Sequence, residues 1–195
     1  MTSAMAAKNL VLKRLVRSVR DVLVSEREPG QMARWVGGAL RPLLGNPYLL
    51  TPEQREPDLH HYRQHILHAE EDGRFSIVAL VWLPEQSTSV HDHVSWCVVG
   101  IHQGEEREVS YEVVGEAGDR CLLPIGESAH RVGSVSVLQP PGDIHTVYNP
   151  GPGLAISIHI YGADVRKLGT SIRHRYDLPV VEALPLPSRQ VAAGG

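Results

Sequence analysis

Cysteine and phenylalanine are scarce in this chain of 195 residues, which has two of the first and one of the second. Cys97 and Cys121 are too few to build the disulfide framework of a small secreted domain, so we expect a reducing, cytoplasmic compartment. No apolar run approaches the ~20 residues of a membrane-spanning helix. The first residues interleave charges with apolar side chains, so we expect neither a secretory signal nor a membrane partner.

An excess of one charge is also lacking, because 19 basic residues stand against 22 acidic ones and the net charge is -3. A chain so near neutrality has no general electrostatic reason to bind nucleic acid. Histidine, by contrast, is abundant with eleven residues, and 18 glycines and 14 prolines predict many turns. The hydrophobic share of 42% is ordinary for a globular protein and supplies a real core.

The chain divides into a helical first third and a β-rich remainder. Apolar residues recur at helical spacing over residues 10–23 and 32–43, and Thr51-Pro52 is typical of a further helix start. From about residue 60, short β-rich runs alternate with Gly and Pro turns such as Gly126, which indicates a sandwich or barrel. These runs cover residues 75–83, 96–103, 106–114, 119–124, 132–139 and 154–161.

We therefore expect three parts: helices packed on the barrel over residues 1–60, a barrel over 61–178, and a surface tail over 179–195. His102 and His130 fall within the β-rich part. Nothing in the pattern around these two histidines marks a site, and we expect both at the surface.

Two histidines at positions i and i+2 open the candidate site. His91 and His93 follow a strand and a turn. Residues two apart on a strand point to the same face, so both imidazoles face one way and Asp92 the other. Two adjacent imidazoles are costly to bury without a partner, which a metal ion supplies. In a second segment, residues 140–149, a Pro-Gly turn enters a strand and projects His145 inward.

The first segment fits the pattern H-x-H-x(3)-[acid]-x(6)-G through His91, His93 and Gly104, and the second fits P-x-G-x(2)-H-x(3)-N. Over about residues 75–161 the chain resembles the cupin superfamily. The resemblance implies a mainly β fold, a double-stranded β-helix barrel with one metal inside, here with an N-terminal helical segment. The usual cupin has glutamate where this chain has Cys97, so the metal ligands are three neutral imidazoles, His91, His93 and His145.

Such a ligand set has consequences for the metal. A ferrous ion held by neutral donors keeps its full +2 charge, which favours an anionic ligand such as a thiolate. Three protein ligands on one face leave positions open for a substrate and dioxygen. We expect Fe(II), although three imidazoles also accept Ni, Co or Zn, because affinity alone does not select iron.

A third segment narrows the resemblance. Ser157, His159 and Tyr161 stand at i, i+2 and i+4 on one strand face, where a hydroxyl, an imidazole and a phenol form a hydrogen-bonded row. With the three histidines and Cys97, this row is similar to the thiol dioxygenases of the cysteine dioxygenase family. In that family a non-haem Fe(II) binds a small thiol and O₂, and the sulfur is oxidised to a sulfinate. The resemblance implies catalytic roles for Ser157, His159, Tyr161 and Cys97, and in some members a thioether joins the last two positions.

The resemblance leaves the thiol open. In cysteine-specific members an arginine before the first barrel strand grips the carboxylate, and counting back from Phe75 that position falls on His65. Gly162 follows Tyr161, as in bacterial members that take other thiols, so we favour 3-mercaptopropionate or ergothioneine over cysteine. Candidate substrate contacts are His65, its neighbours Arg63, Gln64 and His68, and Arg166 and Arg173 after the barrel.

Plainer interpretations stand beside these. Free cysteines are most often small buried hydrophobes, and Tyr161 on a strand could simply pack the barrel. Two other functions stay open: another cupin metalloenzyme, such as a ring-cleaving dioxygenase or an isomerase, and a non-catalytic cupin ligand-binding module. For the enzyme we expect a small thiol and O₂ as partners, with no nucleic acid or membrane, and a monomer or homodimer.

Overall fold

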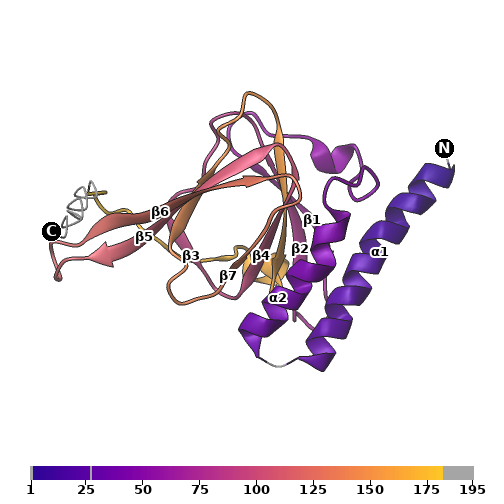
Figure 1. Cartoon of the computed structure of the whole chain (residues 1–195), viewed down its shortest axis with the longest axis horizontal. Helices are drawn as coiled ribbons and strands as arrows, with labels where there is room; N and C mark the ends of the chain where they lie inside the picture. The colour runs from indigo at the N-terminus through magenta and orange to yellow at the C-terminus, as the bar shows by residue number, and fades with distance from the viewer. Residues whose placement is uncertain (1, 27, 182–195) are drawn as a thin grey trace, which may run out of the picture.

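The computed structural model describes residues 2–26 and 28–181 of the chain. Its strands form two five-stranded antiparallel sheets that face each other as a barrel (Figure 1). The first sheet has the order β1-β2-β9-β4-β7 and the second β10-β3-β8-β5-β6. The strands are β1 (Arg63–Ala69), β2 (Ser76–Trp82), β3 (His91–His93), β4 (Cys97–Gln103), β5 (Glu105–Val114), β6 (Cys121–Arg131), β7 (Val135–Leu138), β8 (His145–Tyr148), β9 (Ala155–Tyr161) and β10 (Ile172–Arg175).

Helices cover the outside of the first sheet. The long helix α1 (Thr2–Ser25) and α2 (Pro29–Leu40) lie against each other beside β2, β4 and β7 (Figure 1). Single turns of 3₁₀ helix follow at Arg41–Leu43 and Glu53–Arg55, and the short α3 (Val165–Leu168) comes after the last strand of the first sheet. Within the described residues, no helix is long and apolar enough to cross a membrane.

The central strands β2 and β9 are buried along their whole length. One face of β2 carries Ile77, Ala79 and Val81 toward the helices, and the other carries Val78 and Leu80 toward the barrel interior. Because successive side chains alternate between two buried faces, the strand has no exposed positions and appears in the sequence as a continuous apolar run after Ser76.

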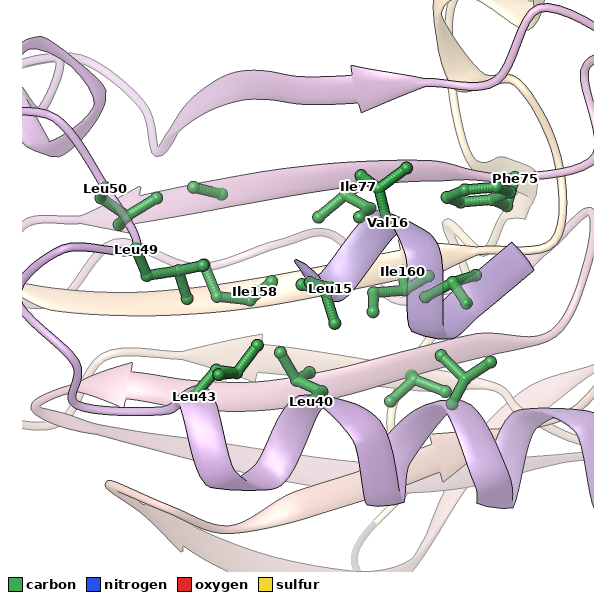
Figure 2. Close-up of a cluster of buried hydrophobic side chains, with 14 of the residues drawn as sticks. Leu15, Val16, Leu40, Leu43, Leu49, Leu50, Phe75, Ile77, Ile158 and Ile160 are labelled. Atoms are coloured by element: carbon green, nitrogen blue, oxygen red, sulfur yellow. The ribbon is translucent and has the colours of Figure 1, made fainter. Parts of the chain in front are cut away.

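An outer cluster of apolar side chains fixes the helices to the sheet. Leu15 of α1 and Leu40 of α2 meet Ile77, Ile158 and Ile160 of the central strands, and all five are fully buried (Figure 2). Burial of each such side chain is worth about 1.5–3 kcal/mol relative to exposure. The helices therefore close the hydrophobic face that the barrel would otherwise present to water.

The mainly β fold with an N-terminal helical segment is confirmed, and several local predictions need correction. The helix start at Thr51 yields only the single turn at Glu53–Arg55. Gly126 is not a turn, because β6 continues through it to Arg131 as an exposed arm paired with β5. Apolar and polar residues do not alternate along this arm, because charged pairs hold its two strands together. One such pair is Arg107 with Glu127, whose Nη1 and Oε1 atoms lie 2.9 Å apart.

His102 was predicted at the surface and is buried instead. Its Nδ1 accepts a hydrogen bond from the Gly45 amide at 3.3 Å, and its Nε2 lies 3.1 Å from the Arg55 guanidinium. Burial lowers its pKa to about 4, so it joins the loop after α2 to the barrel as a neutral ring. His130 is half buried. Of the predicted tail, Val180 makes a bridge with Leu122, and residues 182–195 lie outside the described part of the chain.

Candidate metal centre and active site

Three histidines meet inside the barrel at the second sheet. β3 supplies His91 and His93, and β8 places His145 directly opposite His91 in the antiparallel pair. One ring nitrogen from each lies within 4.8 Å of the others, and all three side chains are buried. The turn formed by residues 140–142 and the H-x-H spacing thus bring together donors that lie about fifty residues apart in the sequence.

Each imidazole is held from behind by an oxygen atom at its Nδ1. The acceptor is the Ser89 carbonyl for His91, at 2.9 Å, and the Asp143 carboxylate for His93, also at 2.9 Å. For His145 it is the Glu108 carboxylate, at 2.8 Å. An acceptor at Nδ1 places the hydrogen there and leaves the Nε2 lone pair free, which is the usual arrangement behind metal-bound histidine.

The donor set fits a metal ion. The Nε2 atom of His145 is buried and has no hydrogen-bond partner among the residues that the structure describes, which is costly unless a cation takes its lone pair. Burial is the main cause, and the nearby His145 and His93 are lesser causes, of a His91 pKa lowered to about 3. This ring is therefore neutral and can donate a nitrogen lone pair to a metal ion. Three such donors with open positions suit a divalent transition metal.

The Glu108 carboxylate behind His145 is ionised. Burial alone would raise the pKa of Glu108, but hydrogen bonds from His130 and His145 outweigh it and lower the pKa to about 2. Glu108 therefore carries negative charge next to a metal ligand and fixes the orientation of that imidazole. This charge reduces the net positive charge that a bound divalent ion brings into the barrel.

Asp92 faces away from the site, as its position between the two histidines predicts. It accepts hydrogen bonds from the Arg173 side chain, the His174 amide and the Tyr176 hydroxyl, the last at 3.0 Å. These contacts tie β10 to β3 and fix the strand that presents the two ligands. Arg173 is thus a structural partner of Asp92.

The predicted row on β9 is present. Ser157 Oγ lies 2.9 Å from His159 Nε2, and Tyr161 Oη lies 3.2 Å from His159 Nδ1. The indole N–H of Trp82 donates to Ser157 Oγ at 3.3 Å. All three members of the row are buried, and burial lowers the pKa of His159 to about 3, so the row is built of uncharged groups.

Cys97 lies beside this row. β4 and β9 are paired so that Cys97 stands opposite Tyr161, and its Sγ is 3.8 Å from His159 Nδ1. Burial raises the pKa of both the Cys97 thiol and the Tyr161 phenol well above their ordinary values. Both groups are therefore protonated at neutral pH.

The histidines and Tyr161 open onto a cavity of about 180 Å³. Its inner wall is apolar, with Leu80, Trp82 and Val147, and Tyr62 stacks on Trp82 with ring centroids 4.5 Å apart. Its polar groups besides the histidines are Gln64, Thr88, Tyr161, Thr170, Ser171 and Arg175. Arg175 donates to Ser89 Oγ and is the one arginine among the described residues that line this cavity.

The structure brings only one of the six predicted substrate contacts into the cavity. Gln64 lines it, but the other five side chains are engaged elsewhere. Their partners are Glu56 for Arg63 and His65, Glu70 for His68, Asp164 for Arg166 and Asp92 for Arg173. Gln64 and His65 are neighbours on β1 and so point to opposite faces, which is why a one-residue shift in the count decides the assignment.

Sequence reasoning missed Arg175, Asp143 and Glu108. Asp143 stands within the Pro-Gly-His segment, two residues before a ligand, and Arg175 stands two residues after the predicted Arg173. Glu108 carried no signal, because a glutamate on an alternating strand is most often solvated. Only the pairing of β5 with β8 brings it next to His145.

Comparison with known proteins agrees with this geometry. The sequence model for cysteine dioxygenase type I matches residues 57–169, which is more than half of the chain and includes the three histidines and the row on β9. The chain belongs to the cysteine dioxygenase type I family. Its cupin barrel, predicted from the two motifs, is thereby confirmed, and the three buried histidines occupy the interior of that barrel.

Solved structures similar to this family member are distant cupins. A cupin 2 conserved barrel domain protein from Salinispora arenicola CNS-205 has 18% identity and a TM-score of 0.40, covering 58% of this chain and 86% of that one. A cupin superfamily protein from Desulfitobacterium hafniense DCB-2 has 16% identity and a TM-score of 0.41, covering 56% and 84%. A protein with a double-stranded β-helix domain from Klebsiella pneumoniae has 17% identity and a TM-score of 0.40, covering 55% and 82%.

Proposed function

We propose that this protein is an iron(II)-dependent thiol dioxygenase that converts a small thiol and O₂ into the corresponding sulfinic acid. The observation that carries the proposal is the trio of buried imidazoles that each bring one ring nitrogen within 4.8 Å of the others while their Nδ1 atoms are held by oxygen acceptors. His91, His93 and His145 would hold the iron, which supplies the redox chemistry with O₂ when bound. Membership of the cysteine dioxygenase family supports the same reaction class.

The cavity favours a thiol with an anionic end. Arg175 and Gln64 are charged and polar groups on its wall, and a guanidinium binds a carboxylate through two parallel hydrogen bonds. The cavity of about 180 Å³ suits a molecule of few heavy atoms. We therefore place 3-mercaptopropionate first, ahead of the larger ergothioneine, with cysteine third because no carboxylate partner for its ammonium group lines the described cavity.

The chain's own residues would then orient the substrate and exclude water. Leu80, Trp82 and Val147 form an apolar wall that keeps bulk solvent from the reacting sulfur. Tyr161, ordered by His159, presents a phenolic oxygen to the same space and can exchange a hydrogen bond with the substrate or with oxygen.

A thiol panel under air tests the proposal. Purified protein loaded with Fe(II) is given 3-mercaptopropionate, ergothioneine and cysteine, while O₂ uptake is recorded and products are weighed by mass spectrometry. We expect the fastest uptake with 3-mercaptopropionate and a product that has gained two oxygen atoms. Uptake with catechols or diketones alone, or no turnover with any thiol, would contradict the proposal.

His145→Ala links the reaction to the metal site. We expect this variant to lose bound iron and thiol-dependent uptake together, because two imidazoles hold a divalent ion far more weakly than three. His60→Ala is the matched control, since His60 is exposed and contacts none of the site. An active variant without iron would remove the three histidines from the reaction.

A further inference from the structure

A buried glutamate lies at the end of the Ser157–His159–Tyr161 row. Glu106 stands on β5 two residues before Glu108, so both side chains point into the barrel. Glu106 is 1% exposed, and its Oε1 has no hydrogen-bond partner among the described residues. A carboxylate so deeply buried is costly to keep, and neither holding the metal nor shaping the cavity explains it.

The neighbours of Glu106 connect it to the row. Burial raises its pKa to about 7, while hydrogen bonding from the Ser157 hydroxyl and the Trp82 indole acts in the opposite direction. The charged or titratable groups that face it are His130 on β6 and Glu108 on its own strand. The order of groups across the barrel is therefore Glu106, Ser157, His159 and Tyr161.

The hydrogens of this row have two self-consistent arrangements. Ser157 Oγ accepts from Trp82, which can only donate, and has one hydrogen of its own to give. If that hydrogen goes to His159 Nε2, then His159 carries its proton on Nδ1 and donates to the Tyr161 oxygen. If it goes to a carboxylate, His159 carries its proton on Nε2, donates to Ser157 and accepts from the Tyr161 hydroxyl.

The buried carboxylate favours the second arrangement. Glu106 is 1% exposed and its Oε1 has no partner among the described residues, so an ionised carboxylate at this place needs a donor such as the Ser157 hydroxyl. With the Ser157 hydrogen directed to Glu106, the lone pair of His159 Nδ1 is free to accept from the Tyr161 hydroxyl at 3.2 Å.

We propose that Glu106 is a positioning residue that accepts the Ser157 hydrogen and thereby fixes His159 as the Nε2–H tautomer. Tyr161 then donates to His159 and turns an oxygen lone pair toward the cavity. This inference rests on the proposed thiol oxidation for its consequence: Tyr161 accepts a hydrogen bond from the substrate thiol. A proton leaving that thiol can pass to Tyr161 as the phenol proton moves to His159, the Nε2 proton to Ser157 and the serine proton to Glu106. The thiolate gains the charge that the carboxylate loses.

The tautomer of His159 can be measured without any turnover. Full-length protein with ¹⁵N-labelled histidine is loaded with diamagnetic Zn(II), and side-chain ¹⁵N shifts are recorded at pH 8.5, where Glu106 is ionised. We expect His159 to carry its proton on Nε2 in the wild type. A proton on Nδ1 in the wild type would overturn the proposal, and this reading requires no variant to fold.

Two variants of Glu106 distinguish its role as a hydrogen-bond acceptor from its role in packing. Glu106→Leu removes the acceptor, and we expect the His159 proton to move to Nδ1. Glu106→Gln keeps an acceptor oxygen without charge, and we expect Nε2–H to be retained. Glu112→Gln, exposed on the same strand, is the control for a generic change of charge. An Nε2–H tautomer in folded Glu106→Leu would contradict the proposal.

Kinetics then distinguish this proposal from the proposed function. We expect Glu106→Leu to lower kcat for thiol-dependent O₂ uptake by about a hundredfold at unchanged KM, since a misdirected row loses its contribution to proton transfer. Glu106→Gln should keep KM and recover part of kcat. If the wild type has the expected tautomer but no activity toward thiols, only the thiol dioxygenase assignment is contradicted. If Glu106→Leu instead changes KM tenfold at constant kcat, the positioning role of Glu106 is contradicted.

Discussion

At the scale of single residues, charge around the cavity is divided between two sides. Glu108 places negative charge behind His145, next to the metal position. Arg175 places positive charge on the cavity wall, where its electrostatic effect contributes to lowering the pKa of His91. Under the proposed function, the thiolate end of a substrate would bind at the metal position, and a carboxylate at its other end would meet the positive charge of Arg175.

Arg175→Leu tests this contact. We expect KM for 3-mercaptopropionate to rise by about 10- to 100-fold, because a hydrogen bond to a charged group contributes about 1.5–3 kcal/mol. Turnover of neutral 2-mercaptoethanol, measured by O₂ uptake with the same preparation, should keep its KM. Equal losses for both thiols would show that Arg175 supports the fold of β10 and does not contact a carboxylate.

At the scale of elements, the long helix is held to the barrel at its second half by an ion pair. The Arg20 guanidinium of α1 meets the Glu70 carboxylate, which follows β1, through two hydrogen bonds of 2.7 and 3.0 Å. The hydrogen bond from Arg20, aided by His68, lowers the pKa of Glu70 to about 2. Arg20 is half exposed, so solvent screens much of the attraction.

Glu70→Gln should lower Tm by a few degrees at neutral pH. Because the pKa of Glu70 is lower in the folded state than its ordinary value of 4.5, its stabilising effect is present above that value and is lost as the pH falls toward 2. The difference in Tm between wild type and variant, followed by circular dichroism, should therefore shrink in acid. Glu71→Gln, at the exposed neighbouring position, should show little difference, and a gap that widens in acid would contradict the assignment.

At the scale of the whole molecule, two apolar clusters share the first sheet back to back. The outer cluster joins the helices to β2 and β9, and the inner cluster surrounds the cavity beside Cys97 and Tyr161. Gly100 lets α2 approach β4 closely, since a Cβ there would lie 2.7 Å from Leu40. Stability and chemistry are thus supported by opposite faces of the same strands.

Leu40→Ala should separate the two roles. Leu40 is fully buried, so we expect a loss of about 2–5 kcal/mol in the free energy of unfolding, measured with urea. Metal content per chain in the folded protein should stay unchanged, because the histidines lie in the second sheet. Leu10→Ala, at a position that is 66% exposed, is the matched control. Parallel loss of metal and stability would mean that the helices also shape the site.

The sequence by itself determined the fold class, the pair His91 and His93 and the row on β9, while His145 on β8 was joined to that pair by its match to the second cupin motif. Motifs such as H-x-H carry these features because a strand's two-residue period fixes which side chains share a face, whatever lies around them. Ser157, His159 and Tyr161 are related in the same local way. Short-range geometry was enough for every feature whose members stand on one strand.

Only the tertiary structure decided which groups from other strands complete the site. Arg175 reaches the cavity, while Arg173 binds Asp92, because β10 pairs with β3 through an irregular register. Glu106 and Glu108 become buried partners only once β5 closes the barrel against β8 and the end of β9. Closure brings together residues far apart in the chain, and no local period encodes their alignment. The charges that set the site's chemistry therefore follow from strand pairing and burial.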